Sequence, residues 1–128
     1  MAEIFIHHIS LIVSNITKSI KFYNEFLNLE IDNSRPELSC DGLWFKIGNQ
    51  QIHLLQVPNP DNIKNRPPHG GNDRHVALMV DNLEPFILRL KTLEIPFHMS
   101  KSGRPALFCR DPDGNTFELI ELDKLDRE

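Results

Sequence analysis

Residues 8–16, His8-Ile9-Ser10-Leu11-Ile12-Val13-Ser14-Asn15-Ile16, match residues 75–83, His75-Val76-Ala77-Leu78-Met79-Val80-Asp81-Asn82-Leu83, position by position. Each stretch starts as a mainly apolar run and changes to helical spacing after Ser-Asn or Asp-Asn. This order is typical of a strand that leads into a capped helix. The repeat therefore predicts two copies of one structural module.

Each copy continues in the same way. The helices that follow have one apolar face, formed by Ile16, Ile20, Tyr23 and Leu27 in the first copy and by Leu83, Phe86, Ile87 and Leu90 in the second. Two strand candidates then follow in each copy, joined by turn-forming residues: 43–47 and 51–56, and 106–109 and 116–122. We expect one α+β domain over residues 1–128, built from two βαβββ modules at 4–57 and 74–122. Residues 58–73, rich in proline and glycine, are expected to be the linker.

The composition favours a globular protein that binds neither nucleic acid nor membrane. The 128 residues are 40% hydrophobic and 25% charged, and the net charge of -4 is spread along the chain without a basic patch. No run of about 18 apolar residues and no secretion signal is evident, so a cytoplasmic location is expected. In that compartment Cys40 and Cys109 are expected to be reduced thiols.

Strand alternation places four potential metal ligands on one face of the expected sheets. In the first strand the more apolar face is expected to cover the helix, which leaves His8 on the other face. The same parity leaves His75, His53 and Glu118 on the face away from the helix. The repeat makes His8 equivalent to His75, and His53 equivalent to Glu118.

This pattern predicts a divalent metal site with His8, His53, His75 and Glu118 as ligands. Imidazole and carboxylate together suit Zn, Ni, Co, Mn or Fe, and the ligand types do not choose among them. A carboxylate at a buried position is costly unless it is paired or bound to a cation, which favours a ligand role for Glu118. Of the other histidines, His7 is expected on the opposite strand face as a structural residue, and His69 and His98 in loops.

With these residues in place, the chain resembles the vicinal oxygen chelate superfamily, which includes glyoxalase I, fosfomycin and bleomycin resistance proteins and extradiol dioxygenases. The resemblance covers nearly the whole chain. Its motifs are His8-Ile9-Ser10-Leu11-Ile12-Val13, Ser19-Ile20-Lys21-Phe22-Tyr23, His75-Val76-Ala77-Leu78 and Asp111-Pro112-Asp113-Gly114-Asn115-Thr116-Phe117-Glu118-Leu119. It implies modules that curl into an open, incompletely closed barrel around a metal-binding cavity. The ligands it implies are His8, His75 and Glu118, and the fourth ligand position falls on His53.

The chain departs from the family pattern at positions that bind substrate. Ile12 and Val57 stand where glyoxalase I is expected to carry its arginine and asparagine anchors for glutathione. After Leu122 the sequence is Asp123-Lys124-Leu125-Asp126-Arg127-Glu128, without the basic and tyrosine residues that hold a phosphonate in fosfomycin resistance proteins. Neither substrate is therefore expected from the resemblance.

The expected function is that of a glyoxalase-like, metal-dependent lyase or isomerase acting on a small substrate that chelates the ion through vicinal oxygens. The metal would act as a Lewis acid for an enediolate-like oxyanion, with Glu118 or displaced metal-bound water as the proton shuttle. Arg104 and Arg74 are the candidate anchors for an anionic substrate.

Two alternatives stay open. One is an extradiol-type dioxygenase that uses Fe(II) or Mn(II), and the other is a non-catalytic small-molecule binding or resistance protein. Exposed strand edges and the resemblance both favour a homodimer, in which His8 and His53 of one chain would meet His75 and Glu118 of its partner.

Overall fold

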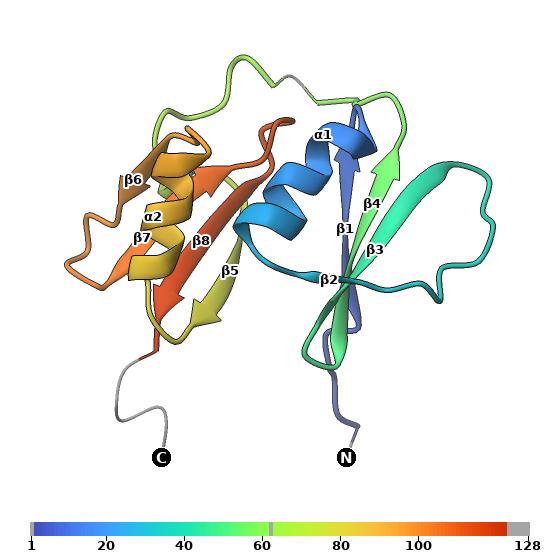
Figure 1. Cartoon of the computed structure of the whole chain (residues 1–128), viewed down its shortest axis with the longest axis horizontal. Helices are drawn as coiled ribbons and strands as arrows, with labels where there is room; N and C mark the ends of the chain where they lie inside the picture. Colours follow the sequence, from blue (N-terminus) through green and yellow to red (C-terminus); the bar gives the residue numbers. More distant parts are fainter. Residues whose placement is uncertain (1, 62, 123–128) are drawn as a thin grey trace. The chain divides into compact units, whose positions relative to one another are not determined.

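The computed structural model describes residues 2–61 and 63–122 as two compact units, of which the first ends at Asp61. Each unit contains one four-stranded mixed sheet with few helices, which confirms the expected α+β class (Figure 1). The sheets are not closed into a barrel. Three stretches of the expected domain lie outside the described residues: Met1, Asn62 of the linker, and residues 123–128.

The first unit has the order of elements that the repeat predicts. Its sheet runs β1-β4-β3-β2, with β1 parallel to β4 and the other neighbours antiparallel. The elements in chain order are β1 (His8–Val13), α1 (Ile16–Ile20), the π-type turn η1 (Lys21–Phe26), β2 (Glu30–Ile31), β3 (Asp41–Ile47) and β4 (Gln50–Gln56).

The second unit repeats this arrangement. Its sheet runs β5-β8-β7-β6, again with the first pair parallel and the rest antiparallel, and α2 lies across one face (Figure 1). The elements are the 3-10 turn η2 (Gly70–Asn72), β5 (His75–Val80), α2 (Glu84–Thr92), β6 (Phe97–Met99), β7 (Ala106–Arg110) and β8 (Thr116–Glu121).

The second strand of each module had no position predicted from the sequence. β2 has two residues and β6 has three, so neither is long enough to show an alternating pattern. His98 lies in β6, and its expected place in a loop is therefore wrong.

Among the described residues, no helix is long and apolar enough to cross a membrane.

The first helix buries a wider face than its 3.6-residue spacing predicts. The backbone N–H of Leu27 donates to the carbonyl of Phe22, five residues back, which is the bonding of a π-type turn. Phe22 and Phe26 are buried in addition to the expected Tyr23 and Leu27. A π-type turn contains more residues than an α-turn, so neighbouring positions come to share the apolar face.

Side chains from the last strand of each unit cap the helix that follows the first strand. Gln56 Oε1 accepts a hydrogen bond of 2.9 Å from the Ile16 N–H, and Glu121 Oε1 accepts one of 3.0 Å from the Leu83 N–H. Both oxygens satisfy donors that the first helical turn leaves without an intrahelical partner. The two modules therefore resemble each other in this tertiary contact as well as in sequence.

The expected strand faces are confirmed in the first unit. Phe45 and Ile52 are register partners and fully buried, and the Tyr23 ring from the helix stacks on Phe45 at 5.6 Å. The neighbouring register pair, Trp44 and His53, lies on the other face of the sheet. His53 is consequently on the face away from the helix.

Candidate metal centre

The backbone register gives the two predicted ligand pairs equivalent positions. Ser10, two residues after His8, is the partner of His53 in the β1–β4 pair. Ala77, two residues after His75, is the partner of Glu118 in the β5–β8 pair. Each sheet therefore holds one candidate ligand on its first strand and one on its last, in the same relative register.

In the second unit the pair is in direct contact. His75 Nε2 lies 3.3 Å from Glu118 Oε1. The other ring nitrogen, Nδ1 of His75, lies 2.9 Å from the Asp73 carbonyl. A carbonyl oxygen only accepts, so Nδ1 carries a hydrogen and donates it. In a neutral imidazole this leaves a lone pair on Nε2 that faces a carboxylate oxygen.

The spacing of this pair fits two ligands of one ion. Ligand atoms about 2.0–2.2 Å from a divalent metal and separated by an octahedral or tetrahedral angle lie roughly 3.0–3.4 Å apart. The distance of 3.3 Å between Nε2 and Oε1 falls in this range. An ion pair with a protonated His75 is the alternative explanation of the same contact.

In the first unit the two histidine rings stack instead of converging. The His8 and His53 ring centroids are 4.0 Å apart with 14° between the ring planes, and Trp44 stacks on His53 at 4.1 Å and 6°. The nitrogen lone pairs of an imidazole lie in the ring plane, so nearly parallel rings do not direct them to one point. In this arrangement one of the two rings must turn before both can bind the same ion.

The side chain of Gln51 fixes the protonation of His53. Gln51 Nε2 donates to Asp32 Oδ2 at 2.8 Å, and Gln51 Oε1 lies 2.8 Å from His53 Nε2. Because a carboxylate cannot donate, the amide group must face Asp32 with its nitrogen and His53 with its oxygen. His53 Nε2 therefore carries a hydrogen, and its available lone pair is on Nδ1.

Burial favours the uncharged form of His53. His53 is only 8% exposed, and loss of solvent lowers the pKa of its imidazole, with the nearby His8 acting in the same direction. Asp32, at the far end of the Gln51 bridge, has its pKa lowered to about 2, chiefly by hydrogen bonds from Ser34 and Gln51. The bridge thus joins an ionised carboxylate to a neutral imidazole.

His7 contacts His8 directly. Their Nδ1 atoms are 2.7 Å apart and their rings meet edge to face at 5.0 Å. His7 precedes β1, so strand alternation does not separate the two side chains, and the expectation that they point apart is wrong. If His8 is to offer a lone pair at Nε2, its Nδ1 must donate to His7.

Within residues 2–61 and 63–122, no group of three or more His, Cys, Asp or Glu side chains is assembled that could hold a metal ion. Each unit instead presents a pair. Burial raises the pKa of the Cys109 thiol to about 12, which argues against a thiolate ligand there. Both described cysteines are free, as expected.

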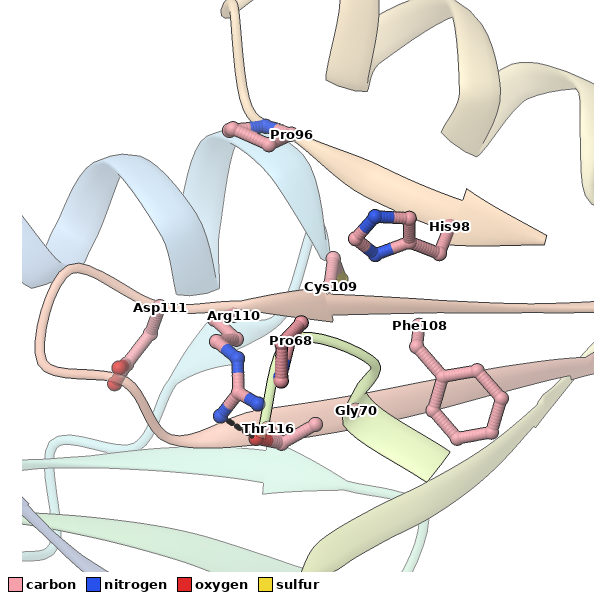
Figure 2. Close-up of a pocket in the computed structure, with 9 residues that line it drawn as sticks. All are labelled: Pro68, Gly70, Pro96, His98, Phe108, Cys109, Arg110, Asp111 and Thr116. Atoms are coloured by element: carbon pink, nitrogen blue, oxygen red, sulfur yellow. Dashed lines mark hydrogen bonds between the residues drawn. The ribbon is translucent and has the colours of Figure 1, made fainter. Parts of the chain in front are cut away.

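A cavity of about 310 Å³ lies in the second unit (Figure 2). Its walls are formed largely by Pro68, Pro96 and Phe108, with His98 beside them. The Phe108 ring contacts the His75 ring edge to face at 5.3 Å, and Phe108 is the register partner of Glu118. Phe108 therefore links the cavity to the His75–Glu118 pair, although neither member of the pair is among the residues that line it.

Arg110 also lines this cavity, but its guanidinium is occupied. Its Nη1 donates to Asp73, Thr116 and the Gly114 carbonyl, and its Nη2 donates to the Pro67 carbonyl (Figure 2 shows the bond to Thr116). With these acceptors already bound, Arg110 offers little to an anionic ligand.

The two arginines expected to anchor substrate lie on exposed parts of the second unit. Arg74 directly precedes β5, and its backbone N–H donates to Asp73 Oδ1 at 2.8 Å. Arg104 lies in the loop between β6 and β7, where its backbone N–H donates to Ser102 Oγ at 3.3 Å. The anchoring role of both residues remains a prediction.

Several residues around the ligand pairs were not singled out from the sequence: Trp44, Gln51, Asp32, Phe108, Asp73, Arg66 and Arg110. Trp44 and Phe108 are equivalent, since each is the register partner of the last-strand ligand. Extending the repeat to β3 and β7 would have found this aromatic pair. The polar residues act through contacts that no local pattern marks.

Comparisons with known proteins agree with this architecture. A plant protein named Glyoxylase I 4, from Arabidopsis thaliana, is 26% identical over 126 residues, which are 94% of this chain and 72% of the relative. The glutathione transferase FosA of Serratia marcescens is 27% identical over 120 residues, 89% of this chain and 78% of that protein. A solved structure of a mutant FosX from Listeria monocytogenes, complexed with Mn(II) and a dihydroxypropylphosphonic acid, shares the fold with a TM-score of 0.73 at 20% identity, covering 99% of this chain and 98% of that one.

Residues 5–119 match the model of the Glyoxalase/Bleomycin resistance protein/Dioxygenase superfamily. The chain belongs to this superfamily. This confirms the resemblance drawn from its sequence motifs.

Proposed function

We propose that this protein is a metal-dependent enzyme of the glyoxalase type, a lyase or isomerase, that acts on a small substrate with two adjacent oxygen atoms. Its cofactor would be one divalent ion, Zn, Ni, Co, Mn or Fe, held by His8, His75 and Glu118. His53 is the fourth candidate, and the stacking of its ring on both His8 and Trp44 makes it the weakest of the set.

The contact between His75 and Glu118 carries this proposal. Nδ1 of His75 donates to the Asp73 carbonyl, so a neutral His75 turns a lone pair toward Glu118 Oε1 at 3.3 Å. Two acceptors at this distance repel each other unless a cation or a proton lies between them. A divalent ion removes this repulsion and uses both atoms as ligands.

The relatives support the same chemistry. One relative bears a glyoxalase name, and the FosX structure of the same fold contains Mn(II). Bound between these ligands, a divalent ion would supply Lewis-acid polarisation of the substrate oxygens. Glu118 is the register partner of Phe108, which lines the cavity, and its carboxylate would accept and return the substrate proton. Arg104 and Arg74 are the proposed contacts for an anionic part of the substrate.

An extradiol-type dioxygenase is the second candidate, favoured by the walls of the cavity. Pro68, Pro96, Phe108 and His98 suit a flat aromatic ring, while the guanidinium of Arg110 is already bonded. A non-catalytic binding protein would use the same cavity without turnover.

The test is elemental analysis by plasma mass spectrometry of the purified protein after reconstitution with each candidate metal. Near-stoichiometric metal is expected in the wild type and in His98→Ala, a matched histidine variant outside the ligand set. It is expected to be absent from the His75→Ala, Glu118→Ala double variant.

Activity then separates the candidates. Turnover of a hemithioacetal without oxygen consumption supports the lyase, whereas dioxygen uptake with a catechol supports the dioxygenase. A wild-type protein that binds none of the metals refutes both enzymes. Ligand-induced thermal stabilisation of the metal-free protein would then support the binding protein.

A further inference from the structure

We propose that Asp73, clamped between Arg66 and Arg110, is a positioning residue for His75. Its side chain fixes residue 73 to the second sheet, and its main-chain carbonyl holds the imidazole with Nε2 directed at Glu118. The role of Asp73 in a metal site rests on the proposed function, whereas its effect on the orientation and tautomer of the His75 imidazole does not.

The Asp73 carboxylate is nearly enclosed by donors. Its side chain is 8% exposed and lies within ion-pair distance of two arginines. Arg66 reaches both carboxylate oxygens in a forked contact, through Nε at 2.8 Å and Nη2 at 2.5 Å, and Arg110 Nη1 lies 2.8 Å from Oδ2. A forked arginine contact defines the orientation of a carboxylate as well as its position.

Arg110 ties this carboxylate to the strand that carries Glu118. The same Nη1 atom lies 2.5 Å from Thr116 Oγ1, and Thr116 stands two residues before Glu118 on β8 (Figure 2). Residues two apart in a strand point to the same face. Through Arg110, the Asp73 carboxylate is therefore held against the face of the sheet on which Glu118 lies.

The linker backbone around Asp73 is held as well. The Asp73 N–H donates to the Gly70 carbonyl at 3.1 Å, and Arg110 Nη2 donates to the Pro67 carbonyl at 2.6 Å. Gly70 packs so closely on β8 that an added Cβ would lie 2.6 Å from Thr116 Cγ2. The main chain of residue 73 is thus located by contacts on both sides.

This fixed main chain determines the hydrogen on His75. The Asp73 carbonyl accepts from Nδ1 at 2.9 Å, which requires the Nδ1–H form of a neutral ring and leaves the lone pair on Nε2. Hydrogen bonds of this kind to a ligand histidine set both its tautomer and its ring orientation. The two arginines that hold Asp73 therefore determine that His75 Nε2 carries the lone pair, although neither arginine contacts this atom through the bonds described.

The test compares Asp73→Asn with Asp111→Asn in the full-length protein. Asp111 is a matched control, since it is a buried carboxylate of the same unit that accepts from the Asp113 and Asn115 N–H groups in the β7–β8 turn. Imidazole ¹⁵N chemical shifts of the metal-free proteins are recorded at mildly alkaline pH, with the His75 signals assigned by their loss in His75→Gln. Zn²⁺ and Mn²⁺ affinities are measured by chelator competition.

We expect the wild type and Asp111→Asn to show His75 in the Nδ1–H form, and Asp73→Asn to show a mixture of both tautomers. We also expect Asp73→Asn to lower metal affinity by at least about tenfold, as second-layer partners of metal ligands commonly do. Arg66→Lys is a milder change that removes the two-atom contact with the Asp73 carboxylate. It is expected to change the His75 ¹⁵N shifts and the metal affinity in the same direction as Asp73→Asn, and it replaces Asp73→Asn in the test if that variant does not fold.

Unchanged His75 shifts in Asp73→Asn and Arg66→Lys would overturn the proposal and leave the clamp as a purely stabilising contact. A wild type that binds none of Zn, Ni, Co, Mn and Fe in the elemental analysis would refute the proposed function. The tautomer readout would still decide whether Asp73 positions His75, because it is made without metal.

Discussion

At the scale of single residues, the histidines of the two units differ in what their hydrogen bonds leave available. His75 donates from Nδ1 to a backbone carbonyl and keeps Nε2 for Glu118. His53 donates from Nε2 to Gln51, which is itself held by Asp32. The two histidines therefore differ in which ring nitrogen is available to bind an ion.

This difference predicts unequal effects of removing His8 and His53. His8→Gln is expected to lower metal affinity at least about tenfold, whereas His53→Gln is expected to have a smaller effect, because the His53 ring stacks on both His8 and Trp44 and would have to turn before Nδ1 could bind the ion. Chelator competition with Zn²⁺ measures both. A larger loss in His53→Gln than in His8→Gln would contradict this order of the two residues as ligands.

The clamp predicts a contribution of Asp73 to stability in acid. Hydrogen bonds from Arg66, followed by those from Arg110, hold the pKa of the Asp73 carboxyl well below its usual range. The folded-state pKa is lower than the unfolded value of about 3.9, so this stabilisation is complete above that pH and is lost as pH falls further. Urea unfolding across acidic pH is expected to show a shallower loss of stability in Asp73→Asn than in the wild type. Parallel curves would exclude this contribution.

At the scale of elements, each module joins its helix to its last strand by one side-chain cap. Gln56 and Glu121 occupy equivalent positions, three residues after His53 and Glu118, and each accepts from the start of a helix. The residues that orient the helices thus lie on the same strands as the candidate ligands.

Loss of either cap is expected to lower the free energy of unfolding by about 1 kcal/mol, because a helical N–H loses its acceptor. Gln56→Ala and Glu121→Ala test this by urea denaturation. Gln50→Ala is the control, since Gln50 is an exposed residue at the start of the same strand as Gln56. Equal stabilities of Gln56→Ala and Gln50→Ala would show that the first cap contributes nothing.

At the scale of the whole molecule, the described sheets leave β1 and β5 at sheet edges, each with one paired neighbour. Large apolar side chains are exposed near β1, where Ile4, Phe5 and Ile6 are 96%, 79% and 63% exposed. Unpaired edges and exposed apolar clusters are typical of surfaces that pair with another chain.

A homodimer is therefore still the predicted assembly. Sedimentation velocity over a dilution series is expected to show a dimer that dissociates at lower concentration in Phe5→Glu than in the wild type. A wild type that is monomeric and metal-loaded at all concentrations would refute a metal site shared between chains.

Much of the fold could be predicted from the sequence because its signals are local. Alternation along His8–Val13 and His75–Val80, turn residues such as Gly114 and the repeat itself predict the modules, their strand faces and the equivalence of the ligand positions. The missed features lack a local signal. β2 and β6 are too short, and the turn at Lys21–Phe26 departs from the 3.6-residue period that was assumed.

The sequence alone determined which side chains can act as ligands and which strand face carries them, because both depend on residue type and spacing along a strand. Only the tertiary structure decided which nitrogen of each imidazole is available. That choice depends on partners such as Asp32 for Gln51, 19 residues apart, and Asp73 for Arg110, 37 residues apart. Contacts over such separations exist only once the sheets and linker have folded, so no local pattern encodes the tautomers of His53 and His75.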